Sequence, residues 1–158
     1  MSISFALFLA FAIGIVAGMR SMTAPATVAW AAYTHHLNVS GTVLTFMGYR
    51  ATLIILIVLA IGELIADKLP NTPARTKPPG LIARVLAGAL AGGCLGVTIG
   101  LSFLPGALLG AAGGIAGAFA GYQWRTGLVR ALRVPDYVIA FVEDALAIGA
   151  GLLIVSRF

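Results

Sequence analysis

Five apolar stretches, each about as long as a bilayer is thick, constrain this chain more than any other feature. A helix needs about 20 apolar residues to cross a hydrocarbon core of about 30 Å. Only 9% of the 158 residues are charged, against about a quarter in soluble domains. We therefore expect an all-α, polytopic transmembrane helical bundle of about five spans (four to six), forming one integral membrane domain over 1–158. The expected spans are Ile3–Gly18, Val43–Ala66, Leu81–Leu104, residues 105 to about 124, and Asp136–Val155.

The segment near 18–37 is predicted to be broken or re-entrant. One helix from residue 3 to 37 would be more than about 50 Å long, which exceeds the bilayer core. Pro25 removes a backbone donor and clashes with the preceding turn. The apolar piece 26–37 is then a kinked extension, an interfacial helix or a re-entrant element.

Basic residues predict the orientation. Residues 68–84 carry four Lys/Arg and residues 125–133 carry three. Positive loops stay in the cytoplasm, so five spans place the N-terminus inside and the C-terminus outside; a sixth crossing by 26–37 moves the N-terminus outside. Four prolines in 68–80 argue against helix there, and Pro105-Gly106 predicts a tight turn. The expected location is a bacterial inner (plasma) membrane.

Glycines recur at four-residue spacing on the third and fourth expected spans. Such rows let helix backbones approach closely in lipid. We expect a glycine-rich hairpin of these two spans, with a face for a homo-oligomer, a dimer above all, as the competing use. The rows are Gly88, Gly92, Gly96 and Gly100; Gly106, Gly110 and Gly114; and Gly113, Gly117 and Gly121.

Two short similar segments within the chain suggest an inverted repeat. Gly18-Met19-Arg20-Ser21 ends the first span, and the segment from Gly121 to Thr126 ends the fourth. Each is followed by a span with an acidic pair. Units that enter a membrane in opposite directions are common in transporters.

Ionisable residues inside the spans are the candidate site. Each costs about 2.5–3.5 kcal/mol to insert, so each needs a partner, water or a role. Glu63 and Asp67 share one helix face, whereas Glu143 and Asp144 point about 100° apart. The expected topology gathers these four acids in the inner half of the membrane, with Arg84 and Arg125 at similar depth.

Each group has a predicted role. Glu63 and Glu143 respond to protons or cations, since burial disfavours a charged carboxylate, while Asp67 and Asp144 support them. Arg20 and Arg125 balance charge or hold an anionic group. Arg20, Ser21 and Thr23 supply a guanidinium and two hydroxyls beside a helix break. Structural salt bridges are the alternative, above all for Arg84 and Arg125.

Several other functions lack a motif. No phosphate loop, nucleophile elbow or His-Glu-x-x-His occurs, no cofactor is expected, and any metal is unknown. The net charge of +5 fits membrane orientation and anionic lipid, so nucleic acid is not an expected partner. Glu63 and Asp67 followed by 74–78 faintly resemble the magnesium-diphosphate motif of intramembrane prenyltransferases, with glutamate in place of the first aspartate.

Three blocks together resemble an uncharacterised family of multi-pass membrane proteins, domain of unknown function 4126. They are residues 18–25, residues 62–76 and the segment from Pro135-Asp136 through Glu143-Asp144. The resemblance covers most of the chain and implies a complete single-domain membrane protein, without an established activity.

Three hypotheses follow. The first is a small membrane transporter or channel-like permease for an ion or small solute, with membrane lipid and a second copy as partners. The second is a non-transporting lipid-interacting or assembly protein whose buried charges are structural. The third is a metal-dependent lipid-modifying enzyme. A wet cavity at the charges favours the first, and a dry, fully paired core favours the second.

Overall fold

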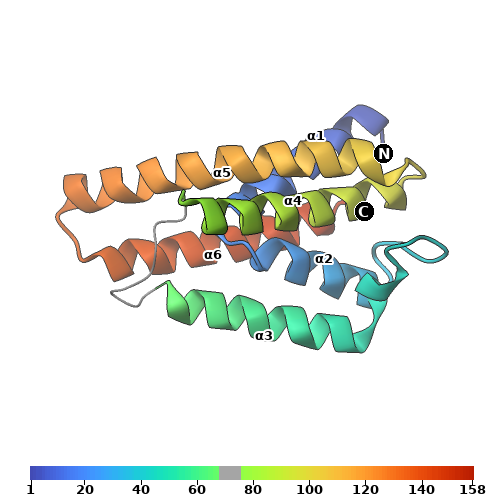
Figure 1. The fold of residues 1–158 in the computed structure, drawn as a ribbon, viewed down its shortest axis with the longest axis horizontal. Coiled ribbons are helices and arrows are strands. Elements are labelled where there is room, and N and C mark those ends of the chain that lie inside the picture. Colours follow the sequence, from blue (N-terminus) through green and yellow to red (C-terminus); the bar gives the residue numbers. More distant parts are fainter. Residues whose placement is uncertain (68–75) are drawn as a thin grey trace.

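The protein is an all-α bundle of six helices in the described residues, 1–67 and 76–158 of this computed structural model (Figure 1). A short 3-10 helix, η1 (Thr45–Gly48), precedes the third. The α-helices are α1 (Ile3–Met19), α2 (Thr23–Tyr33), α3 (Arg50–Ala66), α4 (Pro78–Thr98), α5 (Phe103–Leu132) and α6 (Asp136–Val155).

Three helices are long and apolar enough to cross a membrane. They are α4, α5 and α6, with mean hydropathies of 1.7, 1.6 and 2.2 over their most apolar windows. α1 is also apolar but has only 17 residues, and α2 has 11. At 1.5 Å per residue, α2 is about 16 Å long, roughly half a bilayer core.

The chain reverses direction between α1 and α2. Arg20, after α1, has extended backbone angles (φ −139°, ψ 107°), and α2 starts again at Thr23. Pro25 is only the third residue of α2, where a missing N–H removes no helical hydrogen bond. The segment at 18–37 is therefore broken, and α2 is a separate helix rather than a kinked extension of α1.

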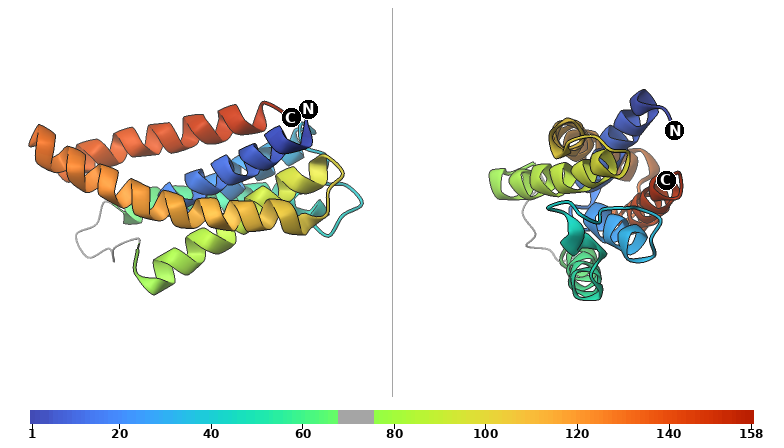
Figure 2. Two further views of the ribbon diagram at one scale, coloured as in Figure 1. Left: turned by 90° about the horizontal axis from the view of Figure 1, so that it is seen from above. Right: turned by 90° about the vertical axis from the view of Figure 1, so that its right-hand side faces the viewer.

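Both termini lie at one end of the bundle, because all six helices alternate in direction (Figures 1 and 2). The five-span arrangement with termini on opposite sides is therefore wrong. That arrangement did not count residues 26–37 as a pass through the bundle. In the structure, α2 returns the chain to the end where the N-terminus lies. The six-segment alternative has the right relative placement of the termini.

Several predicted boundaries also move. α4 begins at Pro78, since prolines at N1 and N2 fit a helix start, although residues up to 80 were expected to be non-helical. The turn before α5 lies at Gly100 (φ +80°), and Pro105 sits inside the first turn of α5. α5 runs to Leu132, so Arg125 and Arg130 are on a helix rather than in a loop. α3 begins at Arg50, not Val43.

Glycines hold α1, α4 and α5 at backbone contact. A Cβ built on Gly110 would lie 2.0 Å from the carbonyl oxygen of Gly88, and one on Gly14 would lie 2.2 Å from that of Gly110. Gly113 and Gly117 face α1 rather than α4, with Cβ positions 2.1 and 2.3 Å from the carbonyls of Phe11 and Ile15. The glycine-rich hairpin exists, and α1 is a third member that the glycine rows did not predict.

The predicted inverted repeat does not match the chain direction. α1 and α5, the helices that end in the two similar segments, run the same way along the bundle (Figures 1 and 2). Units starting with them would not be inverted.

α3 lies at the edge of the bundle, beside α2 (Figure 1). Leu53 is its one buried side chain, and its outer face is apolar and exposed, as at Ile55, Val58 and Ile65. α3 is therefore held in the bundle by the side chains that face α2 and by the polar contacts at its C-terminal end.

Candidate functional site

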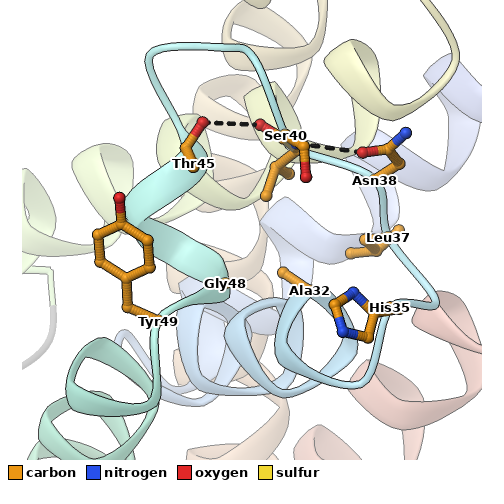
Figure 3. Close-up of a pocket in the computed structure, with 9 residues that line it drawn as sticks. Ala32, His35, Leu37, Asn38, Ser40, Thr45, Gly48 and Tyr49 are labelled. Atoms are coloured by element: carbon orange, nitrogen blue, oxygen red, sulfur yellow. Dashed lines mark hydrogen bonds between the residues drawn. The ribbon is translucent and has the colours of Figure 1, made fainter.

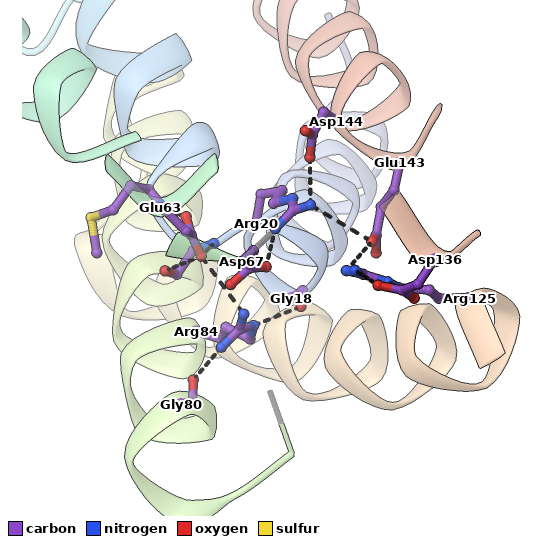
Figure 4. Close-up of polar contacts among 12 residues, drawn as sticks. Gly18, Arg20, Glu63, Asp67, Gly80, Arg84, Arg125, Asp136, Glu143 and Asp144 are labelled. Carbon is purple, nitrogen blue, oxygen red and sulfur yellow. Dashed lines mark hydrogen bonds and ion pairs between the residues drawn. The ribbon is translucent and has the colours of Figure 1, made fainter. Parts of the chain in front are cut away.

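Arg20 is the centre of a buried ionic network (Figure 4). Its side chain is 0% exposed and lies at the break between α1 and α2. Nη1 donates to Asp67 of α3, and Nη2 lies 2.5 Å from Asp144 Oδ1 and 4.0 Å from Glu143 Oε2, both of α6. One cation is thus shared by carboxylates of two helices that flank α2, while its Nε has no acceptor in the described residues.

Glu63 caps the N-terminus of α2. The backbone N–H and the hydroxyl of Ser21 donate to Glu63 Oε1 at 2.8 and 2.7 Å, and the N–H of Met22 donates to Oε2 at 2.8 Å. The first N–H groups of a helix have no partner within it, and its N-terminus carries partial positive charge. A carboxylate from α3 thus supplies the cap that Met22 cannot.

Arg84 performs the opposite task at the C-terminus of α1. Its Nε donates to the carbonyl oxygen of Gly18 at 3.1 Å, and Nη1 donates to that of Gly80 at 2.9 Å. Carbonyls at a helix C-terminus are negative and favour a cation. Nη2 of Arg84 also lies 3.6 Å from Glu63 Oε1. This ion pair therefore neutralises the partial charges at the C-terminus of α1 and at the N-terminus of α2.

Arg125 connects the start of α6 to the centre. Its Nε and Nη2 donate to the two carboxylate oxygens of Asp136 at 2.9 and 2.5 Å. Its Nη1 lies 3.6 Å from the fully buried Glu143. Asp136 is 62% exposed, so the network extends from the bundle interior to its surface.

All five acidic residues of the chain take part in these ion pairs, and among the described basic residues Arg20, Arg84 and Arg125 do so. The predicted gathering of four acids with Arg84 and Arg125 is thus present in the structure. Arg20 and Ser21 join the same network, whereas Thr23 (3% exposed), the first residue of α2, lines an apolar groove instead. Sequence reasoning left Asp136 out, although its seven-residue spacing from Glu143 placed both on one face of α6.

Two of the cavities formed by the described residues lie outside the network. One, of 410 Å³, is formed by the α2–α3 connection and lined by His35, Asn38, Ser40, Thr45 and Tyr49 (Figure 3). The other, of 260 Å³, is an apolar groove between α2, α3 and α6. In the described part of the chain, no group of three or more His, Cys, Asp or Glu side chains could hold a metal ion.

No family model, curated protein or solved structure matches this chain. The resemblance to the multi-pass membrane family therefore stays a prediction, and the function has to be argued from the site.

Proposed function

We propose that this chain is an integral membrane protein with both termini outside. Large apolar side chains are exposed on every long helix, and an exposed apolar surface of this extent fits lipid rather than water. The described basic residues gather at the end where α3 stops and α4 begins: Lys77, Arg84, Arg125, Arg130 and Arg133, against Arg50 and Arg157 at the other. The positive-inside rule makes the former end cytoplasmic.

We further propose that the protein is a small permease for an ion or small solute. The observation that carries the proposal is Arg20, fully buried and shared between Asp67 of α3 and Asp144 of α6. A buried charge inside a membrane is expensive and marks ion pathways and proton relays. Half-length helices whose ends bind charges, such as α2 here, occur at transporter sites.

Protonation or cation binding would act by changing the partners of Arg20. Neutralising a carboxylate removes its attraction for the guanidinium, which then pairs with the other helix. If Asp67 and Glu63 lost their negative charge, the C-terminal end of α3 would lose its contacts with Arg20, Ser21 and Met22. α3 has one buried side chain, so these polar contacts are a large part of what holds it, and its movement would open the bundle.

Reconstitution tests the proposal. Purified protein in liposomes with a trapped pH dye should carry protons down an imposed gradient, or sodium if that ion is coupled. Glu143→Gln and Glu63→Gln should reduce the rate to that of empty liposomes. Because every carboxylate of the chain is in the network, the matched control neutralises an arginine outside it, Arg50→Gln, and should carry ions like the unaltered protein. Normal flux in both glutamine variants would refute the carrier role.

A second candidate is a non-transporting membrane protein with structural charges. The capping of α2 by Glu63 and of α1 by Arg84 favours it, because these two contacts explain both residues without a ligand. It predicts that no variant changes ion flux while each lowers thermal stability. The lipid-modifying enzyme stays a prediction, since the second half of its motif (74–78) begins with residues 74 and 75, which lie outside the described residues.

A further inference from the structure

The apolar groove has three walls that present one face each. Its floor is α2, through Thr23, Ala26, Thr27 and Trp30, at the spacing of one helix face. The wall on α3 is formed by Ile57, Ala60, Ile61 and Leu64, and the wall on α6 by Ile148 and Leu152. Figure 2 shows α2 lying between α3 and α6, and the lining residues of α2 extend from Thr23 to Trp30, so the groove follows α2.

The lining is uncharged and nearly free of hydrogen-bonding groups. The hydroxyl of Thr27 donates to the backbone carbonyls of Thr23 and Ala24, at 3.1 and 2.9 Å, and its methyl group faces Gly151 of α6. Ile57, Ile61 and Leu152 are 40–51% exposed, so the groove is accessible from outside the bundle. It suits a hydrocarbon and excludes a charged ligand.

Its size selects among hydrocarbon occupants. An apolar cavity of about 150 Å³ holds benzene, so 260 Å³ admits a longer chain segment. One turn of a helix with side chains, about 10 Å wide and 5.4 Å high, fills roughly 400 Å³. A helix of a second copy therefore does not fit, whereas a segment of a single acyl chain does.

The groove ends beside the ionic network. Thr23 follows Met22, whose N–H binds Glu63, and Leu64 is next to Glu63 on α3. The groove itself is uncharged, and charges of both signs lie at its end. It therefore complements a molecule with an apolar tail and a polar head. We propose that the groove holds one acyl chain of a membrane lipid, with its headgroup directed toward the network. This adds a lipid-binding site beside the charges of the permease and rests on that proposed function.

Trp30 is a built-in reporter of the groove. The chain has two tryptophans, so Trp30 is the single tryptophan of the Trp124→Phe variant, which serves as the parent protein. We would titrate this protein in detergent with phosphatidylcholine carrying a brominated acyl chain, which quenches tryptophan on contact. Saturable quenching is expected in the parent. Ala60→Phe fills the groove and should reduce the quenching at least threefold, and Ala60→Leu keeps the test open if the larger side chain prevents folding.

Ala51→Phe is the matched control, since Ala51 lies on the same helix, is exposed and does not line the groove. It should quench like the parent. Equal quenching in the Ala51 and Ala60 variants, or quenching that never saturates in the parent, would overturn the inference. Lipid binding is measured here without ion flux. No saturable binding in the parent together with normal ion flux thus rejects only the lipid site, whereas saturable binding without ion flux rejects only the permease.

Discussion

Gly110→Ala should separate the three glycine-packed helices. The substitution adds one methyl group where α5 meets α4, and the new Cβ would lie 2.0 Å from Gly88 O and 3.1 Å from Gly92 Cα. Ordinary van der Waals contact starts at 3.4 Å, so the two backbones must separate by 1.4 Å, which is 3.4 minus 2.0. α1 is coupled to the same point, because the Cβ position of Gly14 lies 2.2 Å from Gly110 O.

The loss of stability depends on which atoms the new methyl group contacts. Overpacking a protein interior costs about 1–3 kcal/mol when side chains can move aside. Here the neighbours are backbone atoms of two helices, which cannot rotate away, so we expect a loss of about 3 kcal/mol or more. For globular chains of this length, each kcal/mol shifts Tm by about 2–4 °C. Gly110→Ala should therefore lower Tm by roughly 6–12 °C.

The assay is thermal unfolding of the purified protein in mild detergent, followed by the loss of monodisperse material on size exclusion. Gly127→Ala is the control on the same helix, because nothing lies within 4 Å of its Cβ position. Alanine is about 1 kcal/mol better than glycine inside a helix, so this variant should be as stable as the parent or more so. Equal Tm values for the two variants would refute close backbone packing at Gly110.

Three further predictions concern the network and the orientation. Arg20→Met leaves buried carboxylates without their shared cation and should cost about 3–5 kcal/mol, measured by the same thermal assay, whereas Arg157→Met should cost little. Ser21→Ala removes the hydroxyl bond to Glu63 and keeps both backbone bonds, so a loss of about 1.5–3 kcal/mol is expected; an unchanged Tm would argue against the cap. In a Cys94→Ala background, Ser40→Cys should react with an impermeant maleimide on intact cells and Arg133→Cys only after permeabilisation; the reverse pattern would invert the topology.

Sequence patterns predicted the helical class and the charged cluster because both depend on local properties. Long apolar runs allow few alternatives to helix, and α6 has the predicted bounds, Asp136–Val155. The acids at 63, 67, 143 and 144 had to lie near the same end of the bundle in any arrangement of antiparallel helices. Their meeting with Arg84 and Arg125 followed from depth alone.

Other features depended on contacts that no local pattern contains. Glycine spacing showed that α4 and α5 could pack closely, but not that Gly14 and Gly18 of α1 would pack against α5 as well. The break after Arg20 was predicted, but the return of the chain along α2 was left open, because an 11-residue helix is too short to count as a span. It is stable there because Glu63 and Arg84, distant in sequence, compensate both exposed helix ends.

The confinement of all five acids to one network leaves the rest of the molecule with a single sign of charge. Apart from the network, its ionisable side chains are basic or neutral, including Arg50, Lys77, Arg130, Arg133 and Arg157. Replacing a carboxylate of the network therefore changes the charge of the interior, while the basic side chains at the two polar ends stay cationic. In a membrane, anionic phospholipids, drawn by about 1 kcal/mol per basic residue, would gather mainly around the end that carries Lys77, Arg130 and Arg133.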